Sequence, residues 1–137
     1  MGLVPMLQLY GLTALVFFAI DLVWLGVVAS GFYQRHLGHL LADEVNWVAA
    51  LLFYCLYIAG ILVFAVRPGL EADSLGQTLA LGAFLGFFAY ATFDLTCMAL
   101  FEDFPLVVVL VDLTWGAVLT GGVAVAGYLV GGWLGIA

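Results

Sequence analysis

The sequence predicts an all-α integral membrane protein in which four transmembrane helices form a single up-down-up-down bundle. Hydrophobic residues make up 67% of the 137 residues and charged residues only 8%. Soluble domains contain about 45–50% apolar residues and about 25% charged residues. The hydrophobic residues also fall into four runs, each longer than the roughly 20 residues that a helix needs to cross a bilayer. These runs use nearly the whole chain, so we expect one domain, residues 1–137, surrounded by lipid.

The first two helices are expected in the N-terminal half. The first covers about residues 6–29. We interpret it as a membrane helix and not as a cleavable signal, because no Lys or Arg precedes its apolar run, which is longer than the core of a signal peptide. The second covers about residues 46–66 and is expected to end at Arg67-Pro68-Gly69, because proline disfavours a helical conformation in the residue before it.

The other two helices follow short loops. The third covers about residues 74–101, and Ser74 followed by Gln77 fits a capping box at its start. The fourth covers about residues 104–133, with Asp103 as a candidate N-cap and a proline in its first turn. These runs far exceed the roughly 9–11 residues of a membrane β-strand, which favours helices. Short loops make neighbouring helices antiparallel.

The first loop is the longest. Residues 31–45 mix leucines with charged residues and two histidines, a pattern that fits a short amphipathic helix lying at the membrane interface. The first two loops face opposite sides and carry one arginine each, so the positive-inside rule is almost balanced, and the histidines favour a cytoplasmic first loop only slightly. The net charge of -7 and the absence of lysine predict no binding of nucleic acid.

Small residues are spaced for close contacts between helices. Gly82 and Gly86 in the third helix are four residues apart. The fourth helix repeats this spacing in the pairs Ala117 and Gly121, Gly122 and Ala126, and Gly127 and Gly131. Small residues let two helix backbones approach closely inside lipid. We therefore expect tight packing along these faces, within the bundle, in a homo-oligomer or against another membrane protein.

Three aspartates inside the apolar segments are the most informative feature. An aspartate at the centre of a membrane helix costs about 2.5–3.5 kcal/mol on insertion scales, so it usually faces the protein interior. Asp21 lies eight residues before the end of the first helix, Asp94 seven before the end of the third, and Asp112 seven after Pro105. Those helix ends share one side of the membrane. The three carboxyl groups are therefore expected in one layer, roughly 10–12 Å below that side.

The residues around the aspartates predict a polar pocket. Asp-Leu-x-Trp occurs at residues 21–24 and again at residues 112–115, and a tryptophan three residues after an aspartate lies on the same helix face. Tyr54 and Tyr57 are expected to pack in the core. The predicted pocket residues are Asp21, Trp24, Tyr90, Asp94, Thr96, Asp112 and Trp115.

Several interpretations of this layer stay open. The pocket binds a lipid, a quinone, an isoprenoid or a proton-coupled solute. Alternatively, the aspartates serve a membrane enzyme as acid/base groups or as metal ligands together with His36 and His39. In a third interpretation the aspartates are buried structural groups that are protonated or hydrogen-bonded. In a fourth the chain is a non-catalytic subunit or assembly factor that docks through its glycine faces. No motif assigns a cofactor.

Nearly the whole chain also resembles a known family. The segments that carry the resemblance are Phe18-Ala19-Ile20-Asp21-Leu22-Val23-Trp24-Leu25-Gly26, Phe53-Tyr54, Ala59-Gly60-Ile61, Phe87-Phe88-Ala89-Tyr90-Ala91-Thr92-Phe93-Asp94-Leu95-Thr96 and Val111-Asp112-Leu113-Thr114-Trp115-Gly116. They are similar to the small bacterial membrane proteins grouped as "domain of unknown function 2177". The resemblance implies a four-helix protein of the bacterial inner membrane and no established reaction. The third segment of the family reads Tyr-Asp-Leu-Thr-Asn, whereas Phe93 and Cys97 replace the tyrosine and the asparagine here, so a hydroxyl and an amide are missing beside Asp94.

Overall fold

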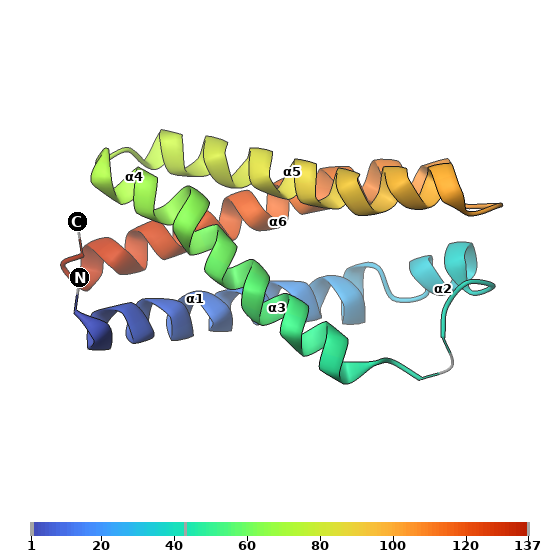
Figure 1. Ribbon diagram of the computed structural model, residues 1–137, viewed down its shortest axis with the longest axis horizontal. Helices are drawn as coiled ribbons and strands as arrows, with labels where there is room; N and C mark the ends of the chain where they lie inside the picture. Colours follow the sequence, from blue (N-terminus) through green and yellow to red (C-terminus); the bar gives the residue numbers. More distant parts are fainter. Residues whose placement is uncertain (1, 43, 137) are drawn as a thin grey trace.

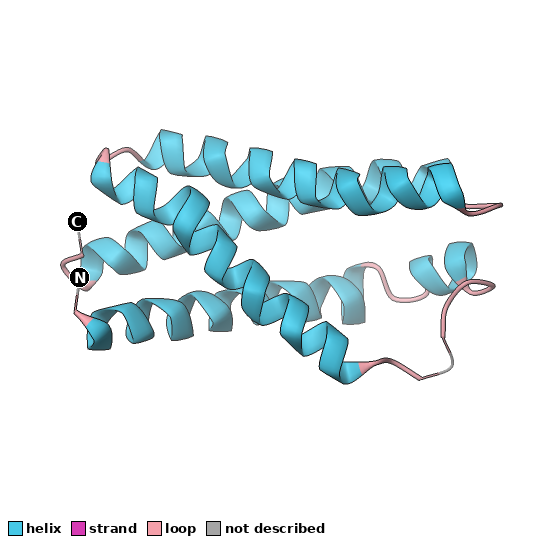
Figure 2. Ribbon diagram, viewed as in Figure 1, coloured by secondary structure: helices cyan, strands magenta, loops and turns pink. Residues whose placement is uncertain are grey.

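Four long helices, each apolar enough to cross a membrane, build the protein in the computed structural model, which describes residues 2–42 and 44–136 (Figure 1). Neighbouring helices run antiparallel, and the part of the chain that is described contains no strand (Figure 2). The predicted all-α fold class is thus confirmed. In chain order the elements are α1 (Leu3–Val23), the π-helical turn η1 (Trp24–Val28), α2 (Phe32–Leu37), α3 (Trp47–Ile61), the π-helical turn η2 (Leu62–Val66), α4 (Arg67–Glu71), α5 (Leu75–Leu100) and α6 (Leu106–Trp133).

The second membrane helix is longer than the sequence indicated. It does not end at Arg67-Pro68-Gly69 but continues through η2 into α4 and ends at Glu71. In the π-helical turn the Arg67 N–H donates to the carbonyl of Leu62, five residues earlier. A proline inside a regular α-helix collides with the carbonyl four residues before it. The wider turn in front of Pro68 relieves that collision, so the helix absorbs the proline.

Side-chain caps mark the starts of two other helices. The Ser74 hydroxyl accepts a hydrogen bond from the Gln77 N–H at 3.1 Å, as the predicted capping box requires. The Asn46 side chain does the same for the Ala49 N–H at the start of α3. The prediction for Asp103 is wrong: the N-cap of α6 is Pro105, two residues later, and Asp103 lies in the preceding turn with φ of 59°.

Glycines bring α5 and α6 into backbone contact. A Cβ on Gly82 would lie 2.6 Å from the Cβ of Ala124 and 2.9 Å from the Thr120 carbonyl oxygen, and a Cβ on Gly86 would overlap the Gly116 carbonyl. The predicted tight packing along these faces is therefore observed inside the chain. Whether the same glycines also serve a partner protein stays a prediction.

The bundle is tightly packed at the end where α4 meets α5. There Gly127 and Gly131 of α6 receive Val66 of η2 and Leu70 of α4, respectively. The core side chains Ile61, Ala65, Val66, Val123 and Ala124 are completely buried. From this end α3 runs obliquely away from α5 and across α1, so the helices separate toward α2 and the first loop (Figure 1).

Candidate functional site

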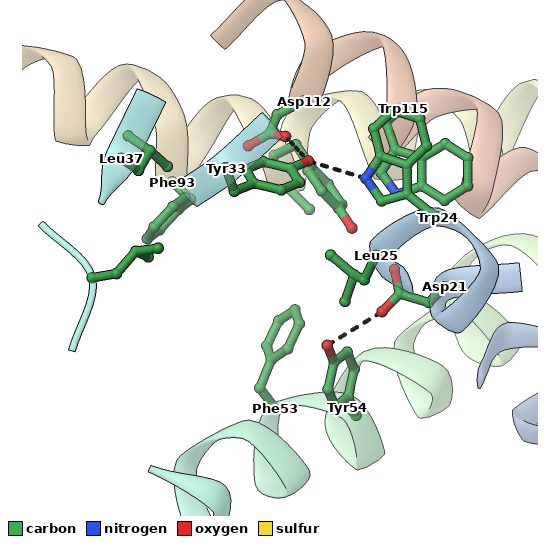
Figure 3. Close-up of a pocket in the computed structure, with 13 residues that line it drawn as sticks. Asp21, Trp24, Leu25, Tyr33, Leu37, Phe53, Tyr54, Phe93, Asp112 and Trp115 are labelled. Atoms are coloured by element: carbon green, nitrogen blue, oxygen red, sulfur yellow. Dashed lines mark hydrogen bonds between the residues drawn. The ribbon is translucent and has the colours of Figure 1, made fainter. Parts of the chain in front are cut away.

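A cavity of about 600 Å³ occupies the end of the bundle where the helices separate (Figure 3). All four membrane helices and the α2 segment contribute to its wall. Polar side chains and aromatic rings from distant parts of the sequence therefore meet in one place. The lining residues are Asp21, Trp24, Leu25, Tyr33, Leu37, Leu41, Phe53, Tyr54, Ala89, Tyr90, Phe93, Asp112 and Trp115.

Asp112 holds the short helix α2 against the cavity. The Tyr33 hydroxyl donates a 2.5 Å hydrogen bond to Oδ1 of Asp112 and accepts one from the Trp24 indole N–H at 3.1 Å. Burial, and then the hydrogen bond to Asp112, raise the pKa of Tyr33 well above its ordinary value near 10. Tyr33 therefore keeps its proton at physiological pH and acts as a permanent donor to the carboxylate.

Asp21 faces the same cavity from α1. The Tyr54 hydroxyl of α3 donates to Oδ2 of Asp21 at 3.3 Å, and the Trp115 indole lies beside the same carboxyl. Trp115 is stacked on Trp24, with ring centroids 4.2 Å apart and planes 9° from parallel. The two Asp-Leu-x-Trp motifs therefore meet through their tryptophans, and the stack connects the Asp21 side of the cavity to the Asp112 side (Figure 3).

Asp94 lies behind the cavity wall. Its exposed fraction is 0%, and neither carboxyl oxygen has a hydrogen-bond partner among the described residues. The group lies next to the Asp112 carboxyl. A buried carboxyl without a partner is costly in a membrane helix, so it is a feature that packing alone does not explain.

Tyr90 of α5, which the sequence assigned to the pocket, lines the cavity. Its ring lies against Gly116, where a Cβ would overlap the ring, so the absence of a side chain on α6 makes room for the tyrosine. Tyr90 lies near both Asp21 and Asp112, and its hydroxyl forms no hydrogen bond within the described chain. It is therefore available to a ligand.

Two predicted site residues do not line the cavity. Asp94 is shielded behind Asp112, and Thr96 lies on the exposed face of α5. Residues two apart on a helix point to nearly opposite sides, so Asp94 and Thr96 could not share a pocket.

The two histidines also lie apart from the aspartates. The Nδ1 atom of His36 is 2.9 Å from the Phe32 carbonyl oxygen within α2, and His39 is exposed. Among residues 2–42 and 44–136, no group of three or more His, Cys, Asp or Glu side chains is placed to hold a metal ion.

The sequence patterns did not predict the part of the wall that α2 and its neighbours supply. Tyr33 and Leu37 are four residues apart, which places them on one face of α2, so the spacing was a usable signal, whereas Leu41 lies in the bend that follows the helix. Tyr54 packs against Phe17, with centroids 5.7 Å apart, and also donates to Asp21, so the assignment to the core gave only half of its role. No comparable signal marked Leu25, Phe53, Ala89 or Phe93.

The fold and the cavity define a small four-helix membrane protein with polar groups gathered at one end of the bundle. The chain belongs to the family described as "Predicted membrane protein (DUF2177)", whose profile matches residues 6–129. The family identified from the sequence segments is thereby confirmed. No curated protein and no solved structure gives a significant match to this chain.

Proposed function

We propose that this protein binds an amphipathic, lipid-like molecule in the cavity and holds its polar end against the aspartate layer. The observation that carries the proposal is the composition of the cavity wall. Asp21, Tyr90 and Asp112 supply the polar groups, while aliphatic and aromatic side chains supply nearly all of the remaining surface. Concave, mostly apolar sites with a few convergent polar groups are typical of small-molecule binding, and about 600 Å³ lies within their usual size range.

The opening of the cavity supports entry from the bilayer. Phe53 of α3 and Phe93 of α5 line the cavity and are nevertheless 52% and 63% exposed, and Leu41 of the first loop is 47% exposed. The two phenyl rings lie across the cavity from the Trp24–Trp115 stack (Figure 3). Exposed rings within membrane-spanning helices contact lipid, so a molecule dissolved in the bilayer reaches the cavity between α3 and α5 without crossing water.

A second candidate is proton-coupled binding or acid/base catalysis at the same site. The observation that favours it is the contact between the carboxyl groups of Asp94 and Asp112. Paired carboxyl groups recur in proteins that move or donate protons. Calorimetry of ligand binding in two buffers of different ionisation enthalpy measures proton exchange. A heat that is independent of the buffer would exclude this candidate.

We propose the bacterial inner membrane as the location, on the basis of the family resemblance. An orientation with the first loop in the cytoplasm is favoured slightly by His36 and His39 on that loop.

Identification of the lipids that co-purify with the full-length protein tests the proposal. Ala89 lines the cavity, so Ala89→Trp places a large ring inside it, whereas Ala80→Trp places the same ring on the exposed face of the same helix. We expect mass spectrometry to find one amphipathic species near equimolar amount with the wild type and with Ala80→Trp, and its loss with Ala89→Trp. An unchanged lipid profile in a folded Ala89→Trp protein would refute the proposal.

A further inference from the structure

The cavity brings acidic groups together without a basic one. Asp21 and Asp112 line it, and Asp94 is buried next to Asp112, whereas none of the 13 lining residues is Lys or Arg. Arg35 is exposed on α2, and Arg67 pairs with Glu71 at 3.1 Å within α4. An anionic head group would therefore lose its hydration without meeting a counter-charge, which is a large cost inside a membrane.

Three hydrogen-bond donors of the wall are already occupied. Tyr33 donates to Asp112, Tyr54 donates to Asp21, and the Trp24 indole donates to Tyr33. The carboxyl groups keep further acceptor capacity, because each carboxyl oxygen can accept more than one hydrogen bond. The Trp115 indole also lies beside Asp21 and the Asp94 carboxyl beside Asp112, so a ligand would share these carboxyl groups with them.

One further polar group of the wall lies near these two carboxyl groups. The Tyr90 hydroxyl, which can donate as well as accept, is the one uncommitted hydroxyl on the wall of the described cavity. A ligand that only accepts hydrogen bonds would offer no further donor to the carboxyl oxygens of Asp21 and Asp112. A ligand that donates would satisfy them.

We infer that the cavity selects amphipathic molecules whose head group carries an O–H or N–H donor, a hydroxyl or an ammonium, and rejects anionic and quinone heads. The donor head meets the carboxyl groups of Asp21 and Asp112, with Tyr90 beside them. The apolar body extends toward Phe53 and Phe93 and the surrounding lipid. This inference rests on the proposed function and specifies its ligand.

The test is the thermal stability of the full-length protein, purified in a neutral detergent, with four probes of similar chain length. The probes are dodecanol, dodecylamine, dodecanoate and a decyl-substituted benzoquinone. A ligand that binds only the folded state raises Tm, and we expect dodecanol or dodecylamine to raise it by about 4 °C or more. Dodecanoate and the quinone should shift the Tm of the wild type no more than they shift the Tm of Ala89→Trp. The variant, whose cavity is filled, serves as the control for effects of each probe on the detergent micelle.

Charge variants separate the two donor heads. Asp21→Asn and Asp112→Asn remove the negative charge but keep a hydrogen-bonding side chain of equal size. A shift from dodecylamine that disappears in these variants identifies an ammonium ligand, whereas a shift from dodecanol that persists identifies a hydroxyl ligand. Glu102→Gln, at an exposed acid in the third loop, is the matched control and should retain either shift.

Different results would refute the inference about the head group and the proposed function as a lipid-binding protein. If dodecanoate or the quinone stabilises the wild type but not Ala89→Trp, and the donor heads do not, the inference is overturned while a lipid-binding cavity stands. If no probe shifts the wild type more than Ala89→Trp, and no lipid co-purifies, both the inference and the proposed function fail.

Discussion

The two halves of the bundle use opposite kinds of side chains. In the closed half, where α4 and η2 pack on α5 and α6, the interface consists of glycines and of buried aliphatic residues such as Ile61, Val66 and Val123. In the open half, around α2 and the cavity, aromatic and acidic residues surround about 600 Å³ of space. The contrast indicates that the closed half supplies most of the packing energy and that the open half is free to hold polar groups that do not stabilise the fold.

The largest loss of stability is expected from a substitution that disrupts the helix packing of the closed half. Gly82→Leu places a side chain where even a Cβ would lie 2.6 Å from the Cβ of Ala124 and 3.0 Å from the Cα of Gly121. Because backbone and not a flexible side chain blocks the space, the two helices must separate. We expect a destabilisation of about 3 kcal/mol or more, or no folded protein at all. Thermal unfolding and size-exclusion chromatography in detergent measure it.

Gly122 provides the matched control on α6. It is exposed, and a Cβ there would meet nothing within 4 Å. Gly122→Leu should therefore leave Tm unchanged or raise it slightly, because leucine has the better helix propensity. Equal losses in both variants would mean that the glycine faces are not special to the α5–α6 contact.

The next two predictions compare two tyrosine hydrogen bonds, one at α2 in the open half and one deeper in the bundle. Tyr33→Phe removes the donor to Asp112 that holds α2, and hydrogen bonds to charged groups contribute about 1.5–3 kcal/mol. We expect hydrogen exchange of residues 32–41 to accelerate about tenfold or more while the global Tm stays nearly constant, because the core lies elsewhere. Arg35→Ala, at an exposed position of α2, should leave the exchange rate unchanged.

Tyr57→Phe removes the corresponding bond deeper in the bundle. The Tyr57 hydroxyl and the Thr120 hydroxyl are 2.7 Å apart and buried, and they join α3 to α6. Hydrogen bonds between membrane helices average about 0.6 kcal/mol and reach about 1.7 kcal/mol. We therefore expect a small decrease in global Tm without local loosening of α2. If Tyr33→Phe instead lowered the global Tm more than Tyr57→Phe, the proposed division into two independent halves would be wrong.

Much of this architecture is encoded in simple sequence properties, and the exceptions are instructive. Hydropathy alone locates the helices, and counting residues from their ends brings Asp21 and Asp112 to one depth. Depth, however, does not give the direction in which a side chain points, which is why Thr96 was assigned to the pocket although it lies on the exposed face. The oblique path of α3 and the π-helical turn before Pro68 depend on packing between helices, which single-sequence patterns do not specify.

The smallest expected effect concerns the carboxyl that the open half leaves unsatisfied. Cys97 is three residues after Asp94 and buried, so the two side chains lie on the same face of α5. Cys97→Asn restores the asparagine of the family pattern and brings an N–H donor beside the unpartnered carboxyl. A net gain of about 0.5 kcal/mol, the low end for a hydrogen bond, is expected, measurable as a small rise in Tm. Cys97→Ala removes the thiol without adding a donor and should give no gain. A lower Tm for Cys97→Asn than for Cys97→Ala would mean that Asp94 has no room for a partner, and that its carboxyl is reserved for the contact with Asp112.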